Sequence, residues 1–214
     1  KTMIQLISNT LLLFWDFDGV IKESIDVKTQ AFVQLFQSYG SEMAERVRKH
    51  HEANGGMSRF EKLPIYLRWC GEEPSEEKVS ALCDQFSRLV MHGVIHAPWV
   101  PGAETYLRLN SHKQIFVLVS ATPQEEIKQI LQALDLLRSF TNVFGAPTSK
   151  KDAIRMTLDR YKIAQQRCLM IGDAKADMEA AMTNYVPFLL RRHGTNRQIF
   201  KQYTGNSVED FKNL

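Results

Sequence analysis

The sequence predicts an α/β fold, a doubly wound parallel sheet of Rossmann-like layout with an inserted α-helical cap domain. Two observations predict it. Short apolar runs alternate with amphipathic helical patterns along most of the chain, which is typical of parallel sheets covered by helices. Residues 25–97 interrupt this alternation, because they show helical patterns only. A chain of 214 residues is long enough for such a core and an insert.

The first apolar run, Leu11 to Trp15, is hydrophobic throughout, as expected of a strand covered on both faces. It leads into Asp16 and Asp18, and the period of two in a strand places both carboxylates on one side. Gly19 then allows a tight turn. Because ligands gather beyond the carboxyl ends of parallel strands, we expect a site here, with its negative charge offset by a cation or a proton.

The insert is predicted to contain about four helices. Apolar residues recur at helical spacing over residues 32–39 and 79–89, and residues 41–54 form a more polar helical pattern. Ser58 and Glu61 have capping-box spacing, which predicts the start of another helix.

Strands and helices alternate again after the insert. Apolar runs end at Val119, Phe144, Ile171 and Leu190, and helical patterns begin near residues 103, 123, 150 and 176. We therefore assign residues 1–24 and 98–214 to a Rossmann-like core and residues 25–97 to the helical cap.

Polar residues also follow the later strands. A Ser-Ala-Thr sequence occupies residues 120–122, Lys150 opens a helix, and Asp173 and Asp177 follow another strand. Together with the first strand, this order resembles the four motifs of the haloacid dehalogenase-like hydrolases: Asp-x-Asp-Gly-Val, a strand-terminal Ser or Thr, a Lys, and Gly-Asp-x-x-x-Asp. The helical insert resembles the C1 cap of the phosphoglycolate phosphatase and β-phosphoglucomutase branch.

The resemblance implies a Mg²⁺-dependent phosphatase that acts on a small phosphorylated metabolite through an aspartyl phosphate. Asp16 is the expected nucleophile and Asp18 the expected general acid/base. Ser120 and Lys150 complete the expected catalytic set and contact the substrate, as does Ala121. Lys150 has the family's spacing for the catalytic lysine better than its neighbour Lys151, which we expect to be solvated.

The resemblance also implies a magnesium site, because Mg²⁺ prefers oxygen ligands. Asp16, Asp173 and the backbone carbonyl of Asp18 are the expected ligands. Asp177 is expected to order the site through water or an outer contact. Thr122 precedes a proline, so a helix cap explains its hydroxyl better than a phosphate contact does.

In the cap, residues 54–59 resemble the substrate-specificity loop of the β-phosphoglucomutase group, whose arginine holds the non-reacting anionic group. Arg59 is therefore expected to bind the substrate, although an exposed helix arginine would equally explain it. His50 and His51 have charged neighbours, which indicates a solvated helix face or a hinge. Lys28 stands where those mutases carry a histidine, which favours a phosphatase over a β-phosphoglucomutase-like phosphomutase.

Two other classes are weaker alternatives. Dehalogenases of this superfamily lack the second aspartate of the first motif and need no metal, whereas Asp18 is present here. A phosphate-sensing binding module is the alternative outside enzymology. A general acid/base such as Asp18 would serve no purpose in a module that must preserve its phosphorylated state.

Composition limits the expected partners. A net charge of +3 without a Lys/Arg-rich run gives no indication of nucleic-acid binding. No apolar run is long enough to span a bilayer, so we expect no membrane partner. Cys70, Cys83 and Cys168 lack metal-site spacing and are expected to be reduced thiols of a cytoplasmic protein. We expect a monomer or weak homodimer.

Overall fold

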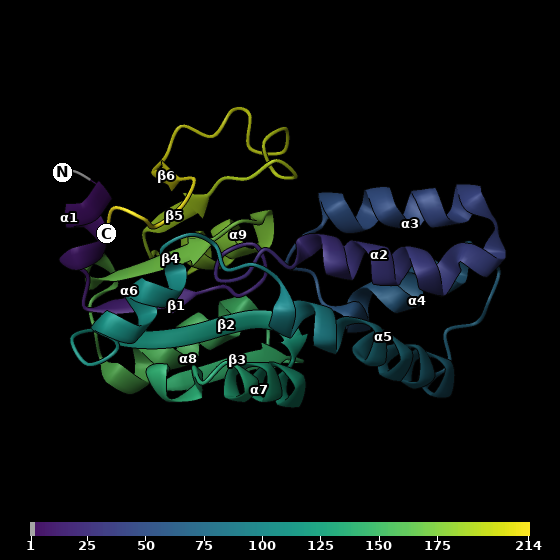
Figure 1. The fold of residues 1–214 in the computed structure, drawn as a ribbon, viewed down its shortest axis with the longest axis horizontal. Helices are drawn as coiled ribbons and strands as arrows, with labels where there is room; N and C mark the ends of the chain where they lie inside the picture. The colour runs from purple at the N-terminus through teal and green to yellow at the C-terminus, as the bar shows by residue number, and fades with distance from the viewer. Residues whose placement is uncertain (1–2) are drawn as a thin grey trace.

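The structure, a computed structural model, describes residues 3–214 and has a core and a helical cap lying to one side of it (Figure 1). A parallel sheet runs through the core in the order β3-β2-β1-β4-β5-β6. Its strands are β1 (Leu12–Trp15), β2 (Ile115–Pro123), β3 (Asn142–Ala146), β4 (Cys168–Gly172), β5 (Phe188–Arg191) and β6 (Ser207–Val208).

The chain winds outward from β1 in both directions, first to β2 and β3 and then to β4, β5 and β6. This confirms the predicted doubly wound sheet. The core helices are α1 (Met3–Ser8), α6 (Ala103–Asn110), α7 (Gln124–Ala133), α8 (Lys150–Tyr161) and α9 (Lys175–Thr183). The order reverses between β1 and β4, and the carboxyl ends of these strands therefore flank the crevice where such folds bind ligands.

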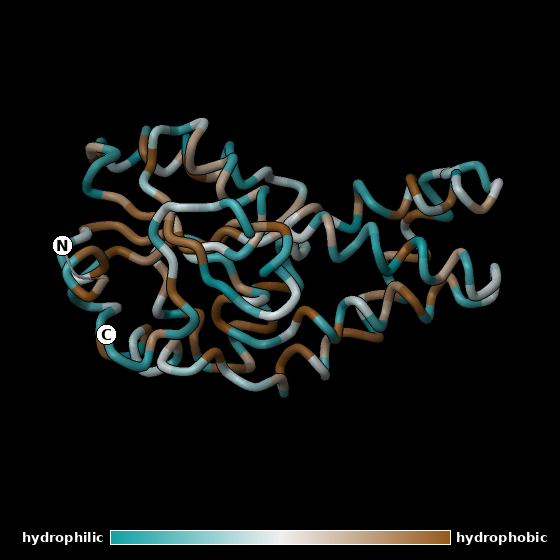
Figure 2. Tube along the Cα trace, turned by 90° about the horizontal axis from the view of Figure 1, so that it is seen from above, coloured by the Kyte–Doolittle hydropathy of each residue, from teal (hydrophilic) through white to brown (hydrophobic). Residues whose placement is uncertain are grey.

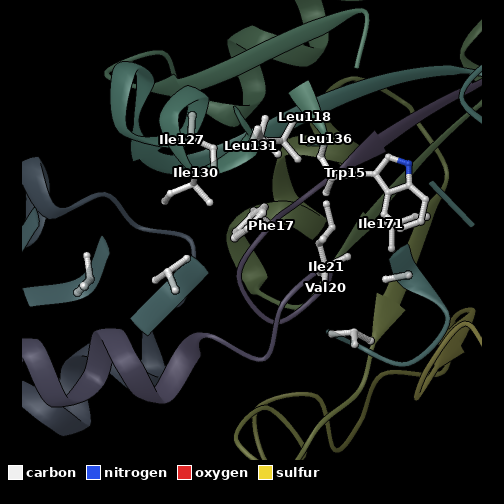
Figure 3. Close-up of a cluster of buried hydrophobic side chains, with 14 of the residues drawn as sticks. Trp15, Phe17, Val20, Ile21, Leu118, Ile127, Ile130, Leu131, Leu136 and Ile171 are labelled. Atoms are coloured by element: carbon white, nitrogen blue, oxygen red, sulfur yellow. The ribbon is translucent and has the colours of Figure 1, made fainter. Parts of the chain in front are cut away.

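Side chains of β1 alternate between two apolar clusters, one on each face of the sheet. Leu13 and Trp15 join the larger cluster, and Leu12 and Phe14 join the other. Figure 3 shows Trp15 in the larger cluster, where Phe17 also packs just after the strand ends. In Figure 2 the hydrophobic segments follow the core strands, whereas the cap helices mix hydrophobic and hydrophilic stretches. Burial on both faces of the sheet explains why β1 is hydrophobic throughout.

The cap consists of α2 (Ile25–Phe36), α3 (Ser41–Ala53), α4 (Arg59–Trp69) and α5 (Glu76–His96). An aromatic cluster joins these helices: the ring centroid of Phe32 lies 4.3 Å from that of Phe86 and 5.6 Å from that of Tyr66. The predicted capping box is present, since the Glu61 carboxylate accepts hydrogen bonds from the backbone and side chain of Ser58.

The two segments that connect the cap to the core lie side by side. The Glu23 N–H donates to the Pro98 carbonyl at 2.8 Å, and the Val100 N–H donates to the Ile21 carbonyl at 2.9 Å. Within residues 3–214, no helix combines the length and apolarity needed to cross a membrane.

Strand β2 differs most from its prediction. Instead of ending at Val119, β2 continues to Pro123, and its register with β3 shifts between these two residues. Residues 120–122 therefore lie inside an irregular strand end and not in a loop. The shift accommodates polar residues that continue the strand beyond the apolar run.

Candidate active site

Asp16 lies directly beyond β1, at the switch point of the sheet, and its side chain is buried. Its Oδ1 accepts the Phe17 N–H at 2.8 Å and contacts Nζ of Lys150 at 2.9 Å. Its Oδ2 has no hydrogen-bond partner among residues 3–214. Asp16 lines a pocket together with Asp18, Lys28 and Lys62, which we call the main pocket because Asp16 lies in it. One oxygen of the Asp16 carboxylate is therefore held, and the other is available.

Lys150 is the first residue of α8, which places its ammonium between two carboxylates. Nζ lies 2.9 Å from Asp16 Oδ1 and 2.6 Å from Asp177 Oδ1. Burial opposes the charge on Lys150, but the two aspartates outweigh this effect and raise the pKa of its ammonium. Lys151 is exposed. Of the two lysines considered from the sequence, the structure therefore brings Lys150 to Asp16.

Asp177 organises the turn between β4 and α9. Its Oδ2 accepts the N–H groups of Asp173 at 3.2 Å and Ala174 at 3.0 Å, while its Oδ1 accepts from Lys150. Gly172 leaves the space that this arrangement requires, because a Cβ there would collide with the Asp177 carboxylate. Both oxygens of Asp177 are thus used to position its neighbours.

The donor set suits a divalent cation. Carboxylate oxygens of Asp16, Asp173 and Asp177 all lie within 4.8 Å of one another, and Lys150 is the ammonium paired with this group. Burial raises the pKa of Asp173 to about 6, although a hydrogen bond with His193 lowers it in part. Burial and Asp177 likewise raise the pKa of Asp16. Three buried acids and one lysine leave negative charge that a cation would compensate, as Mg²⁺ does with oxygen ligands.

Asp18 connects the core to the cap. Its Oδ1 accepts the Ser24 hydroxyl at 2.6 Å, and its Oδ2 forms an ion pair with Lys28 of α2. Lys28 also donates to the Thr122 hydroxyl at 2.7 Å. The sequence did not indicate this pairing, because the two segments meet only when the cap packs against the core.

The interpretation of Thr122 as a helix cap is wrong. Pro123 occupies the N-cap position of α7, and no side-chain hydrogen bond caps that helix. Thr122 instead faces the main pocket beside Ala121. Its hydroxyl is taken by Lys28 because the extended end of β2 carries it toward the cap.

Ser120 is buried inside β2, and its hydroxyl accepts the Thr122 N–H at 3.1 Å. It lines a neighbouring cavity, together with Ala121 and Lys150, which both also line the main pocket. Ser120 and Lys150 thus line one cavity, but Ser120 does not line the main pocket.

Arg59 is not the exposed helix residue that one interpretation of the sequence predicted, because its side chain is 3% exposed. Its guanidinium pairs with both carboxylate oxygens of Glu126 in α7, at 3.1 and 2.5 Å, and donates to the Ser87 hydroxyl at 2.7 Å. The arginine lies at the pocket, but in this structure its charge is already matched by Glu126.

The interpretation of the two histidines as a solvated face is wrong for His51, which is buried. Its Nδ1 lies 2.9 Å from Nζ of Lys62, and both residues line the pocket. His50 is partly buried, and its Nδ1 lies 2.9 Å from the Tyr66 hydroxyl. The two histidines follow one another on α3, so they point in different directions.

The end of β5 and the segment after it supply residues that the motif comparison missed. His193 Nε2 lies 2.8 Å from Asp173 Oδ2, and Asn196 donates to the Asp173 carbonyl at 2.9 Å. Arg191 forms an ion pair with Glu23 and donates to the Gly19 carbonyl at 3.1 Å. Their position at the carboxyl end of a predicted strand was the one available signal.

The loop between α3 and α4, residues 54–58, which we call the cap loop, lies near Lys150 and the start of α9. Gly56 has a φ of +81°, and a Cβ there would lie 3.1 Å from Cβ of Ala176 and 3.5 Å from Nζ of Lys150. The main pocket lies between this loop, α2, α3 and α4 on the cap side and the strand ends of the core. It encloses carboxylates and basic side chains from both parts.

Comparison with known proteins agrees with this arrangement. The family description "haloacid dehalogenase-like hydrolase" matches residues 13–190. A phosphorylated carbohydrates phosphatase from Thermotoga maritima is 26% identical over 175 residues, covering 79% of each chain. A phosphoglycolate phosphatase from Vibrio cholerae is 25% identical over 181 residues, also covering 79% of each.

The fold is shared with solved structures. β-Phosphoglucomutase from Clostridium difficile superposes with a TM-score of 0.73 at 19% identity, over 96% of this chain and 93% of that one. The motif order, the doubly wound sheet and the match over most of the chain lead to one assignment. The chain belongs to the haloacid dehalogenase-like hydrolases.

Proposed function

We propose that this protein is a Mg²⁺-dependent phosphatase that hydrolyses a small phosphomonoester through an aspartyl phosphate on Asp16. The observation that carries the proposal is the state of the Asp16 carboxylate. Lys150 and the Phe17 amide hold Oδ1, while Oδ2 has no hydrogen-bond partner in the described chain. A carboxylate held in this way is oriented for attack on a phosphorus atom in the pocket. The curated relatives named as phosphatases support the reaction class.

In the first step, Asp16 Oδ2 attacks the phosphorus and the bond to the substrate's alcohol oxygen breaks. Asp18 gives a proton to the departing oxygen, so that an alcohol leaves. Lys150 offsets the repulsion between the anionic substrate and Asp16. In this step the Asp18 carboxyl therefore carries the proton when the substrate binds, and the Ser24 hydroxyl and Lys28 hold it as a carboxylate once the proton has left.

In the second step, water attacks the phosphorus of the aspartyl phosphate while Asp18 takes its proton. The bond between phosphorus and Oδ2 breaks, which restores the Asp16 carboxylate and releases inorganic phosphate. Bound Mg²⁺ would stabilise negative charge on the transferring group. Asp16 and Asp173 would hold the ion, with the Asp18 carbonyl as a further ligand and Asp177 positioning Lys150 and the turn.

A phosphate-release assay tests the proposal. A panel of phosphomonoesters, including p-nitrophenyl phosphate, is incubated with Mg²⁺ and with a chelator. Release that requires Mg²⁺ and is lost in Asp16→Asn supports the proposal. A phosphomutase would release little phosphate and would need a bisphosphate to start its cycle. A binding module would retain phosphate compounds without turning them over. We expect the enzyme to work in the cytoplasm as a monomer or weak homodimer.

A further inference from the structure

Lys62 of α4 is a buried basic residue that has no role in the two proposed reaction steps. Its relative exposure is 1%, and it lines the main pocket on the cap side. Nζ lies 2.9 Å from Nδ1 of His51, itself buried on α3. When Lys62 is an ammonium, Nδ1 must accept, because an ammonium only donates. The ring proton of His51 is then on Nε2, which makes it a second donor.

The other cations on the cap side of the pocket already have carboxylate partners. Lys28 pairs with Asp18, and Arg59 pairs with Glu126. Lys62 has no carboxylate within ion-pair distance among residues 3–214, and the nearby Glu61 is exposed and caps its own helix. Lys62 is thus the buried cap ammonium whose charge no acidic side chain of the described chain matches.

This arrangement is unfavourable unless an anion is bound beside Lys62. A buried ammonium without a counter-charge has lost its hydration without gaining an ion pair in return. Burial, together with the charge of Lys28, lowers the pKa of Lys62 to about 7. Burial and Lys62 lower the pKa of His51 well below its usual value, so the ring is neutral and supplies no counter-charge. An anion entering the pocket would supply it.

Packing alone does not explain a lysine here. The walls beside it include Phe32, whose ring centroid lies 5.7 Å from Nζ, and a methionine would fill similar space without an unmatched charge. The position of the ammonium matters because the pocket runs from Lys62 on the cap to Asp16 on the core. A substrate whose phosphoryl group lies at Asp16 would extend its other end toward the cap.

We propose that Lys62, oriented by His51, binds a second anionic group of the substrate at the cap end of the pocket. The preferred substrate is then a phosphomonoester that carries a carboxylate or a second phosphate away from the reacting phosphoryl group. This inference rests on the proposed phosphatase activity. It moves the recognition of the remote anion from Arg59, which Glu126 already neutralises, to Lys62.

The test uses three phosphomonoesters built on the same three-carbon chain, which end in a hydroxyl, a carboxylate or a second phosphate. Values of kcat/KM are measured for the wild type, Lys62→Met and Lys49→Met. Lys49 lies on α3 with its side chain 71% exposed, so its variant controls for net charge. We expect the wild type to prefer an anionic end over the hydroxyl by about 10- to 100-fold, the scale of a charge-assisted hydrogen bond.

We expect Lys62→Met to lose most of that preference and Lys49→Met to keep it. The better of the two anionic substrates identifies the second group as a carboxylate or a phosphate. Equal turnover of all three by the wild type would overturn the inference, as would an equal loss on all three in Lys62→Met. If circular dichroism shows that Lys62→Met does not fold, Lys62→Arg is measured instead and should retain the preference for an anionic end. Loss of that preference in Lys62→Arg, or its absence in the wild type, refutes the inference. A wild type that releases no phosphate even from p-nitrophenyl phosphate would instead refute the phosphatase itself.

Discussion

Arg59 of cap helix α4 and Glu126 of core helix α7 form a bidentate ion pair in which both side chains are buried. The Arg59 guanidinium also lies over the Phe86 ring, 4.4 Å from its centroid. The pair is shielded from water only while the cap rests on the core, because its two halves belong to different parts of the molecule. Its attraction is therefore strongest in the closed arrangement.

The first prediction concerns this ion pair. Glu126→Gln removes the counter-charge of Arg59, and an open cap would let water solvate the arginine instead. We expect the cap of the variant to open more often. The population of the open form should rise about tenfold for each 1.4 kcal/mol by which the free energy of cap closure is weakened. Limited proteolysis of the connecting segments near residues 22–24 and 97–99 should speed up accordingly, and KM should rise.

Glu125→Gln is the matched control for this experiment, since the neighbouring Glu125 side chain is 79% exposed. Proteolysis at the wild-type rate in both variants would mean that the ion pair does not hold the cap closed. A large fall in melting temperature in Glu126→Gln alone would instead assign the pair to the stability of the fold.

The second prediction separates the two adjacent lysines. Lys150 contacts Asp16 and Asp177, whereas Lys151 is exposed. We expect Lys150→Met to lower kcat/KM by at least about a hundredfold, the scale of a lost electrostatic contact in a buried site. Lys151→Met should stay within a factor of about two, because surface substitutions have small effects. Steady-state assays on one substrate decide this, and comparable losses in both variants would contradict the assignment.

The third prediction concerns the two carboxylates after β1. Asp16→Asn should abolish turnover, and Asp18→Asn should reduce it by at least about a hundredfold through loss of acid/base assistance. A single-turnover experiment with the wild type and Asp16→Asn tests the role of the nucleophile. Mass spectrometry of the quenched reaction should find a phosphoryl group on wild-type Asp16 and none on Asp16→Asn. Phosphate release at the wild-type rate by Asp16→Asn would rule out the covalent route.

The fourth prediction concerns metal binding and pH. Burial raises the pKa of Asp173 to about 6 and also raises that of Asp16, so both carboxyls hold protons more tightly in the folded protein than in the unfolded chain. Their stabilising contribution is therefore present at low pH and is lost as the pH rises through the folded pKa values. Mg²⁺ must displace these protons, so its binding should strengthen over the same range.

Melting temperatures measured in chelator and in Mg²⁺ at pH 5 and pH 8 test this expectation. The increase produced by Mg²⁺ should be larger at pH 8. Asp173→Asn should remove most of the increase at both pH values, because a neutral amide oxygen binds Mg²⁺ more weakly than a carboxylate does. An increase that is equal at both pH values in the wild type would show that these carboxyls do not compete with protons for the metal.

The strands and site residues that could be predicted from the sequence are those that depend on the local pattern of apolar and polar residues. The strand leading to Asp16 is recognisable because its neighbours on both faces are apolar, and strand ends of parallel sheets meet at one edge. Lys150 and Asp177 could be placed because each stands at the start of a helix that follows such a strand.

The contacts between the cap and the core were not predictable in this way. Lys28 of α2 contacts Asp18, which follows β1, and also Thr122 at the end of β2, 94 residues away in sequence. The partners of Arg59 and Lys62 are likewise decided by how whole helices pack. Long basic side chains can reach in several directions, so their sequence position does not identify their partners.

The glycines of the cap loop determine how near the cap can come to the core. The backbone at Gly56 lies so near the core that an added Cβ would be 3.1 Å from Cβ of Ala176. Its φ of +81° also disfavours any larger residue. A side chain there would act as a spacer that leaves room for solvent beside Lys150. In the proposed mechanism the lifetime of the phosphorylated Asp16 depends on how many water molecules can reach it, so we expect this backbone contact to influence the balance between rapid hydrolysis and a long-lived intermediate. A single methyl group at position 56 would shift that balance without altering any residue that takes part in the chemistry.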